Sequence, residues 1–312
     1  MDRVELLNNV PLALAQSEEA SNSKKKKFAR FSRFSTSEKI IYIISTVIVI
    51  LLALTMLFPF YWMFASALKS VAENMSLDLV LWSANPNWGV FEKLFNKYDF
   101  GRAILNTVII EISIIPVGTF VSSLAAFAFA KMHFRHKKAL LITIMVGMMI
   151  PYSAVMLPQY RAYDSMGLIG TLWPIIIPGL FGRISMMFFL ITYMKGAIHD
   201  SIIESAKIDG SSFFRMYWQI ALPLAKNAIF AQIIFWFVGI WNDYFAPSLY
   251  LTNENIRTVQ VVLNLLNSDT GGNLEFPVMM AGAFVSSIPM IIFFLIFRNM
   301  FVGSITMSGV KE

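Results

Sequence analysis

The chain has 312 residues, of which 57% are hydrophobic and only 14% are charged, and its formal net charge is +6 at pH 7. A soluble domain is about 25% charged, because charged side chains cover its surface. This composition excludes an ordinary soluble enzyme and a disordered chain, and it indicates a protein that lies in lipid. The chain contains no cysteine, which excludes disulfide bonds, thiolate metal sites and a cysteine nucleophile.

The first 39 residues are polar and basic, with consecutive lysines at 24–27. A cleaved signal peptide would carry a short apolar stretch close behind its positive residues. Here the apolar run begins only at Ile40 and is long, so we predict a retained membrane span. Segment 1–39 is then expected to be a flexible cytoplasmic tail, either solvated or attracted to anionic lipid headgroups.

A helix needs about 20 mostly apolar residues to cross the hydrocarbon core of a bilayer. The sequence contains six such segments, at about 40–63, 104–130, 140–157, 172–193, 225–245 and 278–297. Their apolar runs are continuous rather than alternating, which favours helices over the strands of a barrel. We therefore predict an all-α membrane protein with six transmembrane helices in one domain over 40–312.

The basic residues indicate the orientation, since Lys and Arg are enriched in cytoplasmic loops. With the N-terminus inside, only six of the 25 Lys and Arg residues fall in the outer loops. Most of the others lie in the tail, in the loop 131–138, in the stretch 194–224 and from residue 298 onward. We predict that both termini are cytoplasmic.

Several kinds of chemistry are not expected. The sequence contains no phosphate-binding loop of the G-x-x-x-x-G-K-[ST] type, so the chain is not expected to bind ATP by that route. The only histidines are His133, His136 and His199, all in predicted inner loops, and we expect neither a metal site nor catalytic residues. The inner loops account for the basic charge, so a nucleic-acid partner is not needed to explain it.

The stretch between the fourth and fifth spans carries helix-boundary signals. Ser201 and Glu204 have the spacing of a capping box, in which each side chain satisfies a free backbone N–H at a helix start. Gly210 lies where a helix C-terminus favours a left-handed residue. These signals predict a short helix of about two turns that ends in a tight turn.

A second helix is predicted after that turn. Either Ser211 or Ser212 caps it, and Pro223 is expected to interrupt the chain before the fifth span. The stretch is more apolar than a connector requires, with Ile202, Ile203, Ala206, Phe213, Phe214, Tyr217 and Trp218. Such a surface either docks onto a protein partner or lies on the lipid headgroups as an amphipathic hairpin.

This stretch resembles the loop motif of permease subunits of binding-protein-dependent ABC importers. In that motif Glu-Ala-Ala is followed after three residues by Gly and after nine more by Ile-x-Leu-Pro. The matching residues are Glu204, Ala206, Gly210, Ile220, Leu222 and Pro223, with Ser205 in place of an alanine and Asp209 before the glycine.

The resemblance extends along most of the chain from Ile40 and is to the carbohydrate-type permeases, of which the maltose-type subunit is one. The stretches that resemble the ends of spans or the closing segment are 59–63, 66–69, 106–108, 125–131, 241–245 with Pro247, 302–306 and 308–311. The tail to about Lys39 has no counterpart that we can match.

The resemblance implies a multi-pass permease subunit of the cell membrane, not an enzyme. It implies that the chain pairs with a second permease subunit, which is either homologous or identical. Two ATPase subunits would dock beneath the pair and bind ATP and Mg²⁺. This chain itself would bind no cofactor. An extracellular binding protein would deliver a sugar or oligosaccharide for import by alternating access. The loop helix between helices 4 and 5 would be a coupling helix in an ATPase cleft, where Glu204 pairs with a basic residue. Gly309 and Lys311 would either contact the ATPase subunits or belong to a frayed terminus.

Few ionisable groups fall within the predicted spans. Glu111 and Arg183 either pair with each other or line a translocation pathway, since a charge at membrane depth usually faces a partner or a cavity. Asn242 and Asp243, near the outer end of the fifth span, either bond solute hydroxyls or cap the helix.

Two other classes of function remain as alternatives. A secondary transporter driven by an ion gradient would need intramembrane carboxylates, and only Glu111 lies well inside a span. A membrane enzyme would need a cluster of His or acidic residues near the membrane surface, which the sequence does not contain.

Overall fold

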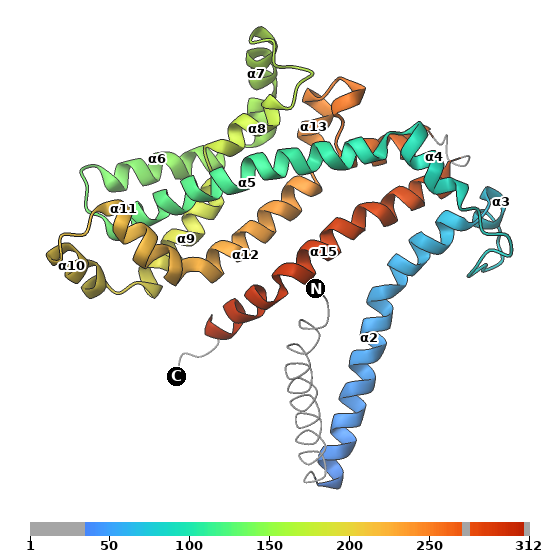
Figure 1. Ribbon diagram of the computed structural model, residues 1–312, viewed down its shortest axis with the longest axis horizontal. Helices are drawn as coiled ribbons and strands as arrows, with labels where there is room; N and C mark the ends of the chain where they lie inside the picture. The colour runs from blue at the N-terminus through green and yellow to red at the C-terminus, as the bar shows by residue number, and fades with distance from the viewer. Residues whose placement is uncertain (1–34, 270–274, 309–312) are drawn as a thin grey trace, which may run out of the picture. The chain divides into compact units, whose positions relative to one another are not determined.

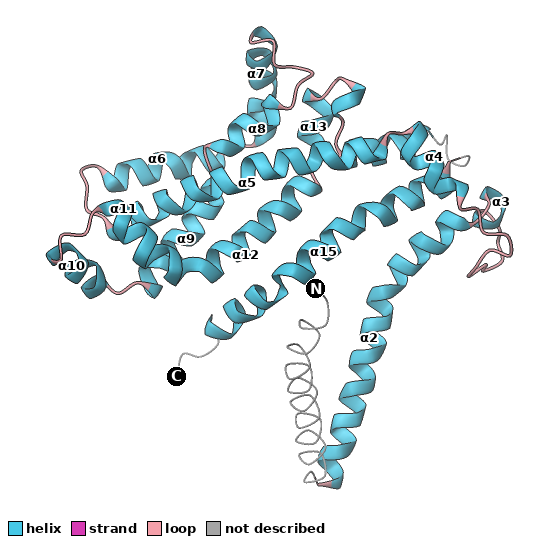
Figure 2. Cartoon of the chain, in the orientation of Figure 1, coloured by secondary structure: helices cyan, strands magenta, loops and turns pink. Residues whose placement is uncertain are grey.

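The computed structural model describes residues 35–269 and 275–308, and these form helices joined by turns, without a β-strand (Figures 1 and 2). The chain divides into two compact units, Met1–Trp62 and Met63–Glu312. The longer helices are α2 (Thr36–Leu68), α5 (Phe100–Lys131), α6 (Lys137–Met149), α7 (Tyr152–Ser165), α9 (Ile184–Ala197), α12 (Leu222–Trp241), α14 (Val259–Asp269) and α15 (Phe276–Ser308). The shorter ones are α3 (Val71–Asn74), α4 (Gly89–Lys97), α8 (Trp173–Leu180), α10 (Asp200–Ile208), α11 (Phe213–Met216) and α13 (Phe245–Tyr250), with a π-helix η1 (Tyr217–Ala221) and a 3₁₀-helix η2 (Glu254–Ile256).

The described part of the first unit is the N-terminal portion of α2. Its side chains from Ile40 to Phe58 are almost all apolar and exposed. A helix of this length that is apolar on every side is suited to lipid or to an apolar partner. The polar exceptions satisfy themselves locally, since Thr46 and Thr55 donate their hydroxyls to backbone carbonyls four residues earlier.

In the second unit α5 packs against α8, α9 and α12, as Figure 1 shows. A cluster of buried side chains fills the space between these helices, with Phe127, Leu190 and Ala225 all 0% exposed. The contact is close because small residues meet there: a Cβ atom on Gly118 of α5 would lie 2.5 Å from the carbonyl oxygen of Gly179 in α8. Small residues let membrane helices approach in this way.

A second apolar cluster joins the start of α5 to α4, α14, α15 and the end of α12. Leu94, Phe100 and Leu266 are each 0% exposed in it. Two stretches between the predicted spans therefore contain packed helices, α4 and α14. Their amphipathic faces bury apolar side chains that a free loop would expose.

The third expected span, 140–157, is not one straight helix. It forms α6 and α7, which meet at an angle of 92°. The bend lies at Pro151, which has no N–H to donate and which favours an extended backbone at Ile150, whose φ and ψ are −75° and 117°. Among the described residues, five helical segments are long and apolar enough to cross a membrane, or up to six if this bent pair is one crossing.

The fourth segment is also interrupted, between α8 and α9. Gly182 has a φ of +87°, and Arg183 is extended before α9 begins. The backbone N–H of Arg183 donates to the hydroxyl of Ser122 in α5 over 2.8 Å. A broken helix in a membrane protein needs such internal partners, because lipid offers none.

We predict that Gly118→Ala destabilises the fold while Gly147→Ala does not. The added Cβ at position 118 would lie 2.3 Å from the Trp236 ring, whereas nothing lies within 4 Å of a Cβ at position 147 in α6. Overpacking a filled interior costs about 1–3 kcal/mol. Thermal unfolding of the purified protein in detergent, followed by size-exclusion chromatography, measures the difference. Equal unfolding temperatures for the two variants would contradict the close contact of α5 and α8.

Candidate functional site

The turn after α10 has the geometry that the glycine predicted. Gly210 has a φ of +72°, in the left-handed region. Its N–H donates to the carbonyl of Lys207 over 3.0 Å, and the N–H of Ser211 donates to the carbonyl of Ala206 over 2.9 Å. These two bonds form a Schellman motif, which ends a helix by satisfying its last carbonyls. The chain therefore reverses sharply at a defined point.

The start of α10 differs from the expected capping box. The helix begins at Asp200, with His199 at its N-cap, and His199 makes no side-chain cap bond. Ser201 therefore lies inside the helix, where its carbonyl accepts the hydroxyl of Ser205 over 2.9 Å. The prediction of a Ser201–Glu204 box was wrong, because the helix starts two residues earlier and its first turn already contains the acidic Asp200.

The second short helix begins as one of the two alternatives predicted. The Ser212 hydroxyl accepts the N–H of Arg215 over 3.3 Å and so caps α11. Pro223 does not interrupt the chain, because α11, η1 and α12 follow without a break. In the π-helix η1 the N–H of Leu222 reaches back to the carbonyl of Tyr217. A π-turn changes the backbone pairing locally, so the helix continues through the proline instead of ending there.

The motif residues divide between a buried and an exposed set. Ala206 is 8% exposed and packs into the α5–α9–α12 cluster, against which Ile220 and Leu222 also pack. Glu204, Ser205, Asp209 and Gly210 are exposed. One set therefore attaches the turn to the membrane helices, and the other is available for contact.

Large apolar side chains lie exposed on both sides of Gly210. Ile208 is 87% exposed and Phe214 is 57% exposed. We call the surface formed by Glu204, Ile208, Asp209, Gly210 and Phe214 the α10–α11 surface. Exposed apolar groups of this size next to a carboxylate favour contact with a protein.

One ion pair, in which only the lysine is buried, was not predicted from the sequence. The Nζ atom of Lys131, at the end of α5, lies 2.7 Å from Oδ1 of Asp200 and 3.4 Å from the carbonyl oxygen of Lys195. The Lys131 side chain is 4% exposed, while that of Asp200 is 80% exposed. The hydrogen bond from Lys131 and its positive charge hold the pKa of Asp200 below its usual value. This contact ties the first turn of α10 to the ends of α5 and α9.

The structure does not bring the four candidate pathway residues together. Glu111 is 4% exposed, and no ion pair among the described residues joins it to Arg183. Arg183 instead precedes α9 as its N-cap. Asn242 and Asp243 bond locally: the Asn242 amide donates to the Val238 carbonyl over 2.9 Å, and an Asp243 oxygen accepts the N–H of Ala246 over 3.3 Å.

Asp243 lines a cavity of about 340 Å³ near the bend between α6 and α7. Tyr152, Phe245 and Tyr250 also line it, and the hydroxyls of Tyr152 and Tyr250 lie 2.9 Å apart. Gln159 contributes an amide from α7. Aromatic walls with a few polar groups are typical of small-molecule pockets, whose volumes begin at about 300 Å³.

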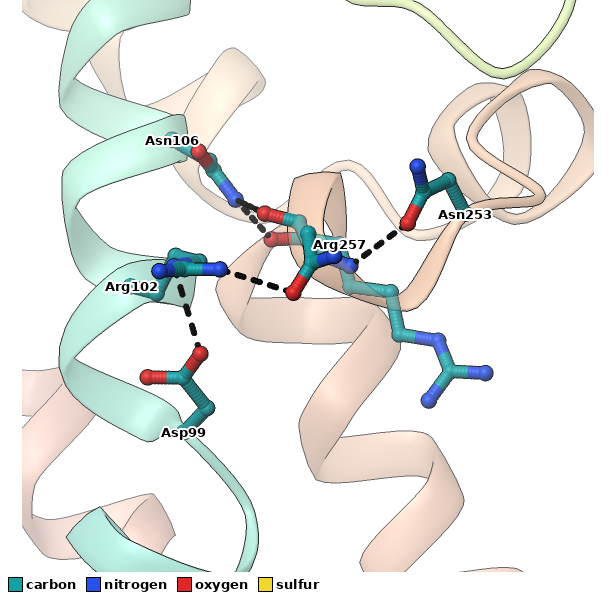
Figure 3. Close-up of polar contacts among 6 residues, drawn as sticks. Asp99, Arg102, Asn106, Asn253 and Arg257 are labelled. Carbon is teal, nitrogen blue, oxygen red and sulfur yellow. Dashed lines mark hydrogen bonds and ion pairs between the residues drawn. The ribbon is translucent and has the colours of Figure 1, made fainter.

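A second polar region lies at the opposite end of α5 from Lys131. Figure 3 shows Asn106 and Arg102 directed toward the segment around η2. The Asn106 amide donates to the carbonyls of Asn255 and Arg257, each over 3.0 Å, and Arg102 donates to the Asn255 side chain over 2.7 Å. The neighbouring Thr107 hydroxyl accepts the N–H of Val259 over 3.1 Å. These bonds explain the Asn-Thr pair, because it satisfies backbone groups of the loop before α14.

The two candidate residues of the C-terminal tail, Gly309 and Lys311, lie outside the described residues.

The chain is similar to known transport proteins over most of its length. Arabinooligosaccharides transport system permease protein AraQ of Bacillus subtilis (strain 168) is 26% identical over 283 residues, which cover 89% of this chain and 99% of the relative. Maltodextrin transport system permease protein MalD of Streptococcus pneumoniae (strain ATCC BAA-255 / R6) is 29% identical over 260 residues, which cover 83% of this chain and 92% of the relative.

A solved structure shares the fold. One chain of a bacterial ABC transporter involved in the import of the acidic polysaccharide alginate matches with a TM-score of 0.70 and 22% identity, over 85% of this chain and 98% of that chain. The sequence pattern of the binding-protein-dependent transport system inner membrane components matches residues 118–306, more than half of the chain and all of the α10–α11 surface. The chain therefore belongs to this family of inner membrane transport components.

Proposed function

We propose that this chain is the permease subunit of an ATP-driven importer and that it moves a sugar or oligosaccharide by alternating access. The family match and the relatives named as arabinooligosaccharide and maltodextrin transport permeases support this proposal. The observation that carries it is the α10–α11 surface, where a Schellman turn at Gly210 presents exposed apolar groups beside carboxylates.

In this proposal both termini are cytoplasmic and α10 is the coupling helix that sits in a cleft of an ATPase subunit. Glu204 is exposed and available to a basic residue of that subunit. Two ATPase subunits bind ATP and Mg²⁺, a second permease subunit pairs with this chain, and an extracellular binding protein delivers the solute. Gly309 and Lys311 belong, in the same proposal, to a tail that contacts the ATPase subunits.

The geometry supports transmission of movement from α10 to the spans. Ile203 and Ala206 bury one face of α10 in the cluster formed with α5, α9 and α12. Lys131 of α5 forms an ion pair with Asp200 in the first turn of α10. A displacement of α10 would therefore move the ends of α5 and α9 with it. The bend between α6 and α7 and the break between α8 and α9 provide places where the spans can change direction.

We propose the cavity beside Asp243 as a place where the solute contacts this subunit. Its aromatic walls suit the apolar face of a sugar ring, and Asp243 and Gln159 suit its hydroxyl groups. Asn242 precedes Asp243 in the chain, and Arg183 is a further candidate for the pathway. The ion-gradient alternative receives no support from the relatives, and Glu111 is the single carboxylate well inside a described span.

Reconstitution tests the proposed function directly. The complex purified through this chain should contain an ATPase subunit, and its proteoliposomes should accumulate the solute only with ATP and the binding protein. Uptake by this chain alone under an ion gradient would contradict the proposal and favour a secondary transporter.

Gly210→Val should uncouple ATP hydrolysis from uptake, while Gly210→Asn should retain most coupling. Space is not limiting, because nothing lies within 4 Å of a Cβ at this position, but the φ of +72° disfavours a side chain. A left-handed backbone costs an ordinary residue about 1–2 kcal/mol, and asparagine tolerates it better than valine. The ratio of solute imported to ATP hydrolysed is the measurement, and an unchanged ratio in the valine variant would refute the coupling role.

Lys131→Met should lower the same ratio roughly a few-fold, because α10 loses its ionic link to α5. The matched control is Lys138→Met, since Lys138 is an exposed lysine in the first turn of α6. Asp200→Asn should act in the same direction, and the double variant should be no worse than Lys131→Met alone, because both substitutions remove one contact. Additive effects would show that the two residues act separately.

A further inference from the structure

One groove in the second unit combines an apolar lining with a single carboxyl group. It lies between α5, α12 and α15 and has a volume of about 440 Å³. Phe237, Trp241 and Glu111 line it and are 8%, 1% and 4% exposed. Ile112 and Ile296 also line it and are 68% and 67% exposed, so the groove opens at the surface of the helix bundle.

The carboxyl group of Glu111 has no partner within the described part of the chain. Its Oε1 atom is buried without a hydrogen bond, and no ion pair of the described residues includes it. Glu111 follows the start of α5 by 11 residues, which corresponds to about 16 Å along the helix, and it lies well inside a helix that is long and apolar enough to cross a membrane. A carboxyl at this depth without a partner is costly, so such groups usually face one.

The rest of the groove supplies hydrogen-bond acceptors and no free side-chain donor. Pro116 and Pro289 line it, and a proline leaves the carbonyl four residues earlier without its usual helical donor. For Pro116 that carbonyl belongs to Ile112, which also lines the groove. The indole N–H of Trp241 is already used, since it donates to the carbonyl of Ser286 over 3.1 Å.

We propose that this groove receives a membrane helix of the second permease subunit that presents a lysine or arginine to Glu111. The proposal rests on the subunit pairing in the proposed function and gives that pairing a place on this chain. An apolar helix surface fills the groove, and the basic side chain satisfies the carboxyl and the free carbonyl of Ile112. Charge complementarity thus selects the partner, because a purely apolar helix would leave these acceptors unsatisfied.

The same requirement argues against the apolar stretch 47–60 of a second copy of this chain as the occupant. Residues 47–60 of α2 are apolar except for Thr55, whose hydroxyl donates to the carbonyl of Leu51 over 2.9 Å. The acyl chains of lipids have no donor either. Neither this stretch nor lipid would satisfy Glu111.

Photo-crosslinking in the intact complex tests the location. The chain contains no cysteine, so Ile112→Cys adds a single attachment point for a thiol-reactive benzophenone. Ile142→Cys is the matched control, because Ile142 is 61% exposed on α6. We expect Ile112→Cys to crosslink to a helix of the second permease subunit that contains Lys or Arg, and the control not to reach that helix. Crosslinks only to α2, to a second copy of this chain or to lipid would overturn the proposal.

Replacement of the carboxyl tests the chemistry. Glu111→Leu should reduce the amount of second permease subunit that co-purifies with this chain about tenfold, and Glu111→Gln should reduce it less, because the amide still accepts a hydrogen bond. The elution profile of the variant chain shows whether it remains folded. Full pairing in a folded Glu111→Leu variant would overturn the role of the carboxyl. If the wild-type chain brings down no second permease subunit, the proposed function itself fails.

Discussion

The absence of water in the hydrocarbon core is the constraint on which this structure depends. Wherever a span is interrupted, its free backbone groups need a partner from the protein. The break before α9 has one, because Ser122 of α5 accepts the N–H of Arg183. The irregular turn before α12 keeps its pairing through the π-helix η1. The packing of α5 against α8 and α9 is therefore also what allows the fourth span to bend, and a change at Gly118 would disturb both.

The α10–α11 surface shows how local and distant interactions combine. Gly210 and its Schellman bonds set the direction of the chain, and these depend only on neighbouring residues. The position of the surface relative to the spans depends on Ala206 in the core and on the contact between Lys131 and Asp200. The first part gives the turn a defined shape, and the second makes its movement a movement of the membrane helices.

The sequence alone predicted the features that follow from hydropathy and local rules. The apolar segments, the left-handed Gly210 and a cap at either Ser211 or Ser212 are of this kind, and the structure shows Ser212. It missed the bend at Pro151, because a proline inside an apolar run is compatible with either a kink or a reversal. The contact between Lys131 and Asp200 joins residues 69 positions apart, and no periodicity reports such a pair. Of the two alternatives for Glu111 and Arg183, the ion pair is absent from the described residues, and sequence alone does not tell which charged groups face each other across a helix bundle.

Both ends of α5 are fixed by polar contacts, Asn106 and Thr107 to the segment before α14 at one end and Lys131 to α10 at the other. The helix has 32 residues, so its ends are about 46 Å apart. Over a rod of that length a tilt of about 5° carries one end about 4 Å sideways. A small tilt of α5 would therefore displace its end at the opposite membrane face by about 4 Å. The hydrogen bonds along the helix would be kept.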